Sequence, residues 1–383
     1  MSPPPLSLSG QGYALVRNQH ADGRRILAPD HLQPADFAAA ALTVRGWQDY
    51  APTPLHSLAW AAEAAGVAAV LYKDESPRFG LESFKALGGA YAVGKQVEQW
   101  RAAGKDPANL TVCCASDGNH GRSIAWGAQR FGCQCVVYVP KVMAKARRGA
   151  IERFGAHTVS VPGYDEGLKE AAFQAERNGW IVVSDTSYEG YTEIPQDVMA
   201  GYGLIAEETA EQWQQPPTHL FLQAGVGGMA AALALRFQQL GFNLKLVVCE
   251  AEAAPCWFRS VAANEWQAVE SRGTIQAGLD CGEPSILAWD MLRHHATGAC
   301  WISDDRAADA VRRLANGTPG VAAGESAVAG LAALLAGAQS KAAREMLELD
   351  ARSRIFLLGS EGPTDPDGYA RALAGKWAPP HAG

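Results

Sequence analysis

Short apolar runs rich in β-branched residues alternate with longer amphipathic segments along the chain from residue 109 onward. A short apolar run bounded by turn residues favours a strand, and apolar positions that recur every three to four residues favour a helix. The predicted strands are residues 111–115, 135–139, 158–161, 180–184, 220–223, 244–249, 301–302 and 355–358. The predicted helices are residues 120–131, 145–154, 166–178, 196–213, 229–239, 307–315 and 326–335.

Strand, helix and strand follow one another in series, which is typical of βαβ units with parallel strands. The pattern predicts an α/β fold with two open, twisted, mostly parallel sheets flanked by helices. Small-ligand sites in such folds lie beyond the carboxyl ends of strands, so we expect a site in a cleft between two domains. We expect the first ~35 residues to form an irregular arm and the last ~20 a frayed tail, because neither shows a clear period.

Composition narrows the class of protein. A length of 383 residues suits two domains, and 48% hydrophobic against 19% charged residues allows a large core. The net charge of -7 argues against a nucleic-acid binder. We find no signal-peptide pattern at the start and no apolar run of about 18 residues, so we expect a cytoplasmic protein without a membrane span.

Eight cysteines occur without a CxxC pair, so a structural zinc site is not expected and no other metal is predicted. Buried, reduced thiols are the expected state in a cytosolic protein. Cys256 and Cys281 lie in segments punctuated by glycine and proline. Whether those two form a disulfide is left open by the sequence.

One lysine stands at a predicted helix start. Lys85 follows Ser83, a suitable N-cap residue, and therefore falls in the first turn of the next helix. The positive end of the helix dipole disfavours an ammonium there, and Schiff-base lysines need a lowered pKa. An isolated lysine is more often a solvated surface residue, so this segment alone does not decide.

Two glycine-containing turns each join a predicted strand to a predicted helix. Ser116, Asp117, Gly118 and Asn119 form the first, and its amides are suited to bind an anion such as a carboxylate. The second runs through Gly225, Val226, Gly227, Gly228 and Met229, and such a loop cradles a phosphate. Glu250 follows Gly225 by 25 residues (250 − 225), which also approximates a dinucleotide-binding fingerprint. An oxidoreductase using NAD or FAD therefore stays an alternative.

Two further polar segments follow strands. Residues 184–191 form a polar and aromatic loop that contains Asp185, and we expect it to line a cleft. Ser360 follows the last strand, where its hydroxyl is suited to face a ring nitrogen. Ordinary connecting turns are the alternative for both segments.

Taken together and in this order, the segments resemble those of the fold-type II pyridoxal-phosphate (PLP) enzymes, the tryptophan synthase β-subunit family. The similarity runs from about residue 53 to residue 365 and is stronger still to the diaminopropionate ammonia-lyases within that family. The matching segments are residues 78–81, 84–91, 117–122, 189–192, 223–227, 278–279 with 281–284, and 324–326. Gly228 and the pair Ala115–Ser116 depart from the pattern expected of that group, which has alanine at the first place and two threonines at the second.

The resemblance implies a cofactor and a set of contacts to it. Lys85 would form the Schiff base with PLP, and Asn119 would contact the cofactor's phenolic oxygen. Ser360 would face the pyridine nitrogen, and a hydroxyl there suits β-elimination better than transamination. The phosphate would rest on the amides of Gly225, Val226, Gly227, Gly228 and Met229. The implied large PLP-binding domain covers residues 1–84 and 187–383, and the smaller α/β domain covers residues 85–186.

The resemblance also implies a reaction, the α,β-elimination of 2,3-diaminopropionate through aminoacrylate to pyruvate and two ammonia. Lys85 would take the α-proton of an L-substrate and Asp117 that of a D-substrate, while Asp185 would position the β-amine. The substrate carboxylate would bind Ser83, Ser116 and Gly118. His120 is expected to orient its turn rather than to act as acid or base.

The implied partners are a small amino-acid substrate and a second copy of the chain in a homodimer. Nucleic acid and membrane are not expected. A serine or threonine dehydratase, or a lyase for another β-substituted amino acid, is the nearest alternative. A non-catalytic amino-acid sensor is disfavoured because Lys85 is present.

Overall fold

The computed structural model describes residues 7–116 and 118–377. The chain divides into two compact units. The large unit takes in the chain up to Ala28, Pro52–Pro77 and everything from Ile205 onward, and the small unit takes in Pro29–Ala51 and Arg78–Leu204. The chain thus crosses between the units four times. The small unit includes residues 29–51, 78–84 and 187–204, which lie outside the smaller domain expected from the sequence.

An eight-stranded sheet forms the centre of the large unit, in the order β1-β2-β11-β10-β9-β12-β4-β3. The five strands from β11 to β4 are parallel, and the strands at both edges are antiparallel to their neighbours. The bounds are β1 Ser7–Gly10, β2 Tyr13–Arg17, β3 Leu55–Ser57, β4 Ala69–Asp74, β9 His219–Gln223, β10 Lys245–Ala251, β11 Gly298–Ile302 and β12 Arg354–Gly359.

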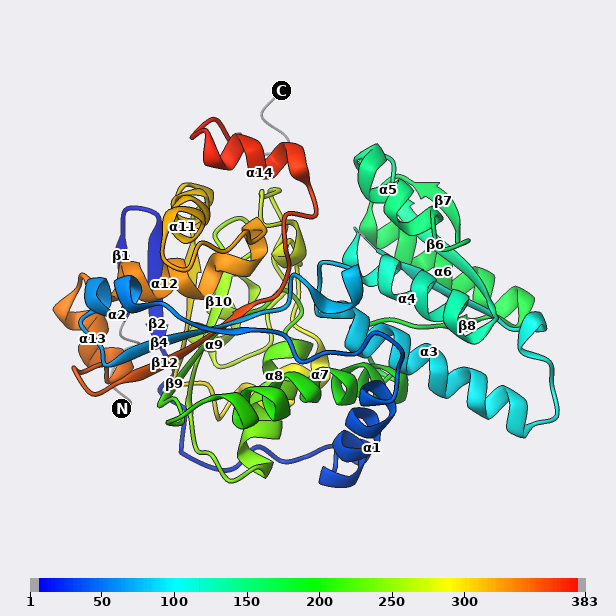
Figure 1. Cartoon of the computed structure of the whole chain (residues 1–383), viewed down its shortest axis with the longest axis horizontal. Coiled ribbons are helices and arrows are strands. Elements are labelled where there is room, and N and C mark those ends of the chain that lie inside the picture. Colours follow the sequence, from blue (N-terminus) through cyan, green and yellow to red (C-terminus); the bar gives the residue numbers. More distant parts are fainter. Residues whose placement is uncertain (1–6, 117, 378–383) are drawn as a thin grey trace. The chain divides into compact units, whose positions relative to one another are not determined.

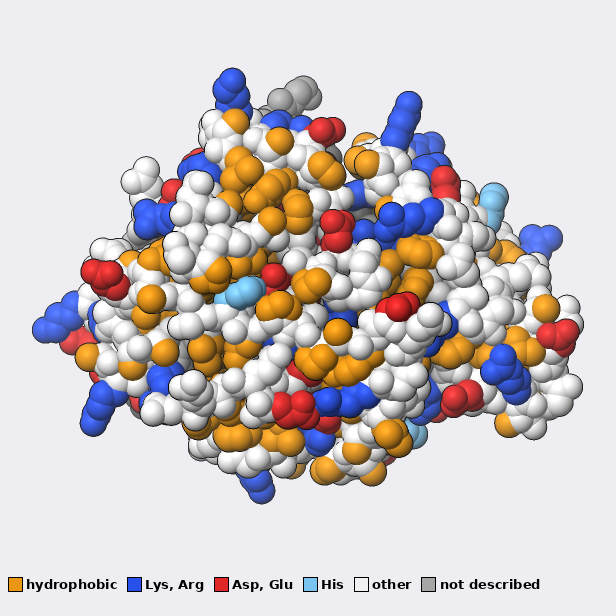
Figure 2. All heavy atoms as spheres, in the orientation of Figure 1, with side chains coloured by type: hydrophobic (Ala, Val, Ile, Leu, Met, Phe, Trp, Pro, Cys, Tyr) orange, Lys and Arg blue, Asp and Glu red, His pale blue; other side chains and the backbone are white. Residues whose placement is uncertain are grey.

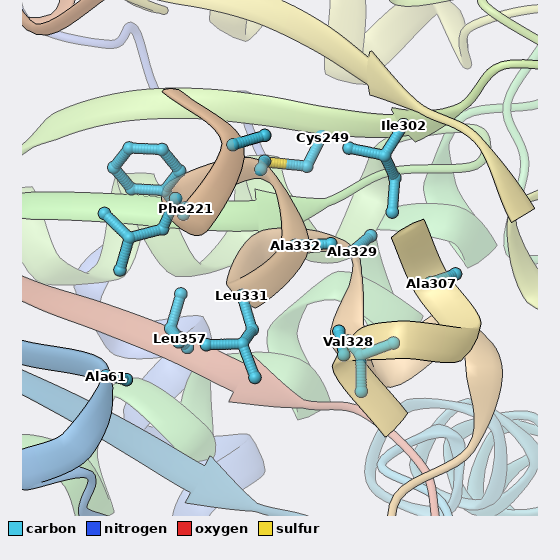
Figure 3. Close-up of a cluster of buried hydrophobic side chains, with 14 of the residues drawn as sticks. Ala61, Phe221, Cys249, Ile302, Ala307, Val328, Ala329, Leu331, Ala332 and Leu357 are labelled. Atoms are coloured by element: carbon cyan, nitrogen blue, oxygen red, sulfur yellow. The ribbon is translucent and has the colours of Figure 1, made fainter. Parts of the chain in front are cut away.

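Helices cover this sheet, and α12 packs directly on it. Figure 3 shows Leu331 and Ala332 of α12 beside Phe221 of β9 and Leu357 of β12. A Cβ at Gly330 would lie 2.4 Å from the Phe221 carbonyl oxygen, so only glycine permits this close approach. The helices of this unit are α2 Ala59–Ala65, α8 Gly228–Gln239, α9 Cys256–Ala263, α10 Ile286–Leu292, α11 Asp304–Asn316, α12 Ala329–Ala338, α13 Lys341–Leu347 and α14 Pro366–Leu373, with short 3-10 turns at Ala277–Leu279 and Glu325–Val328.

The small unit contains a four-stranded parallel sheet in the order β7-β6-β5-β8 (Figure 1). Its strands are β5 Thr111–Ala115, β6 Gln134–Pro140, β7 His157–Val161 and β8 Ile181–Val182. Gly121 of α4 (Asn119–Phe131) packs on Val137, whereas Gly167 of α6 (Tyr164–Asn178) packs on Tyr138. Because successive residues of a strand point to opposite faces, α4 and α6 cover opposite sides of the sheet.

The remaining helices of the small unit are α1 Pro34–Arg45, α3 Lys85–Ala102, α4 Asn119–Phe131, α5 Lys145–Glu152 and α6 Tyr164–Asn178, with 3-10 turns at Arg78–Gly80 and Pro107–Asn109. Helix α7, Glu193–Gln212, begins in the small unit and ends in the large one. The expected fold class, α/β with two mostly parallel sheets, is confirmed. Each predicted strand and helix from residue 109 onward is present with its ends moved by a few residues, the last predicted helix being divided into a 3-10 turn and α12.

Two expectations about the ends of the chain are wrong. The first ~35 residues are not an irregular arm throughout, because β2 pairs with β11 and extends the large sheet. The last ~20 residues are not only a frayed tail, since α14 packs beside α11 (Figure 1) and the Ala372 carbonyl accepts a hydrogen bond of 3.0 Å from Arg312 Nη1. Both segments are stabilised by partners far away in sequence, which a local pattern does not reveal.

Charged side chains of both signs are mixed on the face of the molecule drawn in Figure 2. On the face in Figure 2, Lys and Arg side chains are scattered among Asp, Glu and apolar side chains rather than gathered in one stripe. Among residues 7–116 and 118–377, no helix is both long and apolar enough to cross a bilayer. Within the same ranges, no group of three or more His, Cys, Asp or Glu side chains is arranged to hold a metal ion.

Candidate active site

Lys85 is the first residue of α3, as the sequence predicts. The residue at the N-cap position is Phe84 rather than Ser83, which corrects the expected helix start by one residue. Ser83 nevertheless stabilises the first turn, because its Oγ accepts a hydrogen bond of 3.3 Å from the Lys85 amide. The Lys85 side chain therefore projects from the first turn of α3.

The Lys85 amine forms an ion pair with the Asp185 carboxylate. The Lys85 side chain is 22% exposed and that of Asp185 12%, so Lys85 is not a solvated surface lysine. Burial alone would raise the pKa of Asp185, but His120, which is protonated at the acidic pH where this carboxyl titrates, and the Lys85 ammonium outweigh it and hold that pKa well below its usual value. Asp185 is therefore a carboxylate at neutral pH.

His120 lies against the same carboxylate. Its Nε2 is 2.9 Å from the Val183 carbonyl oxygen, which can only accept, so Nε2 carries the ring proton. Its Nδ1 lies 3.8 Å from Asp185 Oδ2 and, within the described part of the chain, has no hydrogen-bond partner. Burial lowers the pKa of His120, so the ring is neutral and ties the turn to the end of β8.

A tyrosine that the sequence did not single out holds the loop around Asp185. The Tyr191 hydroxyl accepts a hydrogen bond of 3.0 Å from the Ser184 amide and donates one of 2.9 Å to the Val182 carbonyl. Its ring stacks on Tyr188 with centroids 4.9 Å apart. These contacts position the backbone immediately before Asp185. The only sequence signal was an aromatic residue in a polar loop.

The turn before α4 is held together by one serine. Ser116 Oγ accepts hydrogen bonds from the amides of Gly118 at 3.0 Å and Gly121 at 2.8 Å. Asn119 Oδ1 accepts one of 3.0 Å from Arg122 Nη2, so the amide group of Asn119 is oriented with its amino side as the donor. Asp117, the expected base for a D-substrate, lies outside the described residues.

In the large unit, the glycine loop joins β9 to α8. Gly227 is the N-cap of α8 with a φ of 93°, and a Cβ there would lie 2.2 Å from the Trp257 ring. The carbonyls of Gly225 and Val226 accept hydrogen bonds from Trp257 Nε1 at 3.1 Å and from the Ser285 amide at 2.9 Å.

The amides of this loop are oriented differently from its carbonyls. Within the described residues, none of the amide nitrogens from Gly225 to Met229 donates to a protein acceptor. Such a cradle at a helix N-terminus fits the several acceptor oxygens of a phosphate. The fit extends to Ser360, which is 4% exposed and directly follows β12. Because β12 is parallel to β9, Ser360 lies at the same sheet edge as the glycine loop.

The acidic residue that suggested a dinucleotide fingerprint has a different role. The two carboxylate oxygens of Glu250 each accept a hydrogen bond of 2.7 Å, from the amides of Trp257 and Phe258. Glu250 is fully buried and caps the start of α9, so it is not available to a ribose. No disulfide joins Cys256 and Cys281 in the described part of the chain.

Comparison with known proteins defines the class to which this site belongs. The family described as "Pyridoxal-phosphate dependent enzyme" matches residues 47–358. The chain belongs to that family, and its cofactor is pyridoxal phosphate.

Named relatives narrow the resemblance. The diaminopropionate ammonia-lyase of Escherichia coli (strain K12) is 37% identical over 366 residues, covering 87% of this chain and 89% of the relative. That of Salmonella typhimurium (strain LT2) is 36% identical over 355 residues, covering 84% and 87%. A crystal structure of the Escherichia coli enzyme in complex with an aminoacrylate-PLP azomethine reaction intermediate matches with a TM-score of 0.87 and 34% identity over 95% of this chain and 97% of that chain. The expected fold-type II architecture and cofactor are thereby confirmed.

Proposed function

We propose that this chain eliminates ammonia from 2,3-diaminopropionate to give, with one water, pyruvate and two ammonia. The observation that carries the proposal is the partly buried Lys85–Asp185 ion pair at the start of α3. It occurs in a chain that is 37% identical to a diaminopropionate ammonia-lyase over 87% of its length. A carboxylate beside the reactive amine is suited to a substrate with a second ammonium group.

The contacts to the cofactor are assigned residue by residue. Lys85 would bond covalently to PLP, and the Asn119 amino group would donate to its phenolic oxygen. Ser360 would face the pyridine nitrogen, and its hydroxyl would not force that nitrogen to be protonated. When bound, PLP supplies an electron sink for the α-carbon of an amino acid. The backbone amides of Gly225, Val226, Gly227, Gly228 and Met229, which have no protein acceptor in the described structure, would hold the phosphate.

The proton transfers fall to side chains near the start of α3. The Lys85 amine, once the substrate amine has displaced it, takes the α-proton of an L-substrate at Nζ. The Asp185 carboxylate attracts the β-ammonium. Its low pKa supports this role, because the carboxylate stays ionised. Asp117 takes the α-proton of a D-substrate from the opposite side. Ammonia then leaves the β-carbon, and water converts the remaining aminoacrylate to pyruvate and a second ammonia.

The substrate carboxylate is assigned to the hydroxyls of Ser83 and Ser116 and to the Gly118 amide. Both hydroxyl oxygens accept backbone amide bonds, which leaves each hydroxyl proton available as a donor. The Gly118 amide donates to Ser116 and has to turn outward to reach a carboxylate.

The test is an assay of pyruvate and ammonia with D- and L-diaminopropionate, serine and threonine. Diaminopropionate should give the highest kcat/KM, and turnover of serine or threonine alone would favour a dehydratase instead. Lys85→Ala should remove the visible absorbance of the bound cofactor and the product of borohydride reduction. Asp117→Asn should reduce the activity on the D-isomer more than on the L-isomer, and equal losses would contradict its assigned role.

We also infer a homodimer in the cytoplasm. The family resemblance supports the dimer, and the free cysteines among the described residues support a reducing compartment. Sedimentation equilibrium of the PLP-loaded protein tests the first inference, and a monomer would contradict it. Cell fractionation tests the second.

A further inference from the structure

A buried hydroxyl without a partner faces the candidate active site. Tyr202 of α7 is 1% exposed, and its Oη forms no hydrogen bond within the described part of the chain. Buried side-chain polar atoms nearly always have a partner, so an exception at a site calls for a functional explanation. The charged neighbours of this hydroxyl are the Lys85 amine and the Asp185 carboxylate. The contact with the amine does not reach hydrogen-bond geometry in this structure.

Glycines bring Tyr202 to this position. A Cβ at Gly201 would lie 2.3 Å from the Leu87 carbonyl oxygen, so α7 and α3 meet backbone to backbone. A Cβ at Gly88 would lie 2.5 Å from Tyr202 Cε1, so the tyrosine ring fills the space above that glycine. The ring also packs on Phe84 with centroids 4.7 Å apart. The hydroxyl is therefore held in place beside the residue that follows Phe84, which is Lys85.

The single negative charge of Asp185 cannot neutralise two ammonium groups. In the free protein its carboxylate is paired with the Lys85 amine. Under the proposed function, the β-ammonium of the substrate takes that carboxylate while the Lys85 amine has been released and carries a proton. The Lys85 ammonium, which has three protons to donate, then loses an acceptor in a largely buried site, where a lost hydrogen bond to a charged group is costly. The described residues offer the Tyr202 oxygen at this place.

We propose that Tyr202 is a positioning residue that accepts a hydrogen bond from the Lys85 amine when substrate occupies Asp185. The inference rests on the proposed function and extends it to a residue on α7. Burial raises the pKa of Tyr202, so it acts as a neutral hydroxyl and not as a base. The titratable groups around the amine are Asp185, with His120 behind it, and Tyr202 itself.

The experiment compares Tyr202→Phe with Tyr13→Phe. Tyr13 is a matched control because its hydroxyl is also buried and has no partner in the described structure, but it lies in the core of the large unit beside Cys249 and Cys300. For this labelling both variants are made in an Asp185→Asn background, which takes the carboxylate away from the amine as an occupying substrate would, whereas the kinetic measurements keep Asp185. Competitive acetylation of the PLP-free proteins, followed by mass spectrometry, gives the pH midpoint of the Lys85 amine. This readout does not depend on turnover or on the identity of the substrate.

Losing an acceptor for the ammonium should make Lys85 easier to deprotonate. Tyr202→Phe should lower the acetylation midpoint by about one pH unit, the size expected for a hydrogen bond to a charged group. The PLP-loaded variant should lose roughly tenfold in kcat for diaminopropionate with little change in KM, since the bond is formed only after substrate has bound. Tyr13→Phe should change neither quantity.

An unchanged Lys85 midpoint in folded Tyr202→Phe overturns the proposal. Circular dichroism establishes folding, and if that variant does not fold, the same labelling of Tyr202→Met decides in the same way. Failure of the proposed function looks different, because a protein that does not bind PLP or turn over diaminopropionate still reports the Lys85 midpoint.

Discussion

Replacing Gly227 by alanine should disturb the proposed phosphate-binding loop more than the rest of the fold. Gly227 has a φ of 93°, and its added Cβ would lie 2.2 Å from Trp257 Cζ2. Trp257 is fully buried and donates from Nε1 to the Gly225 carbonyl, so its ring cannot move without breaking that bond. The loop has to move instead, and it carries the amides that are proposed to hold the phosphate.

The expected loss has two parts. A left-handed conformation costs an alanine about 1–2 kcal/mol in stability. Displaced amides lose hydrogen bonds to a charged phosphate at about 1.5–3 kcal/mol each. If one or two such bonds are lost, the affinity for PLP should fall by roughly 10- to 10,000-fold. Titration of the PLP-free protein with PLP, followed by absorbance, measures this affinity.

Gly241 provides the matched control. It lies just beyond the end of α8, has the same φ of 93°, and an added Cβ would meet nothing within 4 Å. Gly241→Ala therefore has the same backbone strain without the steric overlap, and it should lose about 1 kcal/mol of stability while keeping its affinity for PLP. If Gly227→Ala bound PLP within about threefold of the wild type, the assignment of this loop to the phosphate would be refuted.

Three further substitutions test the fold around the site. Burial raises the pKa of Glu250 from 4.5 to about 8, so its contribution is fully present below pH 4.5 and is lost as the pH rises through about 8. Between pH 4.5 and 8 the unfolding free energy of Glu250→Gln, measured with urea, should therefore rise relative to that of the wild type by at most about 1.4 kcal/mol per pH unit. Parallel plots of unfolding free energy against pH for the two proteins would contradict this. Gly201→Ala should lower the unfolding free energy by about 1–3 kcal/mol, because the added Cβ pushes α7 away from α3. The control is Gly149→Ala on α5, whose added Cβ meets nothing within 4 Å and which should be neutral or stabilising. Lys73→Met should cost about 3–5 kcal/mol, since Glu208 at 2.7 Å would be left as a buried charge, whereas Lys341→Met on the exposed pair with Glu345 should change stability by less than about 0.5 kcal/mol. Equal effects of the two lysine variants would show that burial does not decide the strength of these pairs.

The local pattern of the chain determined the order of strands and helices from residue 109 onward, and with it the two mostly parallel sheets. It also placed Lys85 in the first turn of a helix and the glycine loop between a strand and a helix. These features depend on neighbours within one or two turns of the same element. Periodicity and turn chemistry are therefore sufficient to predict them.

Only the tertiary structure decided which side chains meet. Asp185 pairs with Lys85 from 100 positions away, and Tyr202 reaches the same amine because Gly88 and Gly201 let two helices touch. Glu250 shows the converse, since its spacing suggested a ribose contact and its burial against α9 gave it a capping role. The strand β2 likewise depends on pairing with β11, almost 300 residues away. Contacts of this kind follow from how elements pack and which strands are neighbours, and a local pattern contains neither.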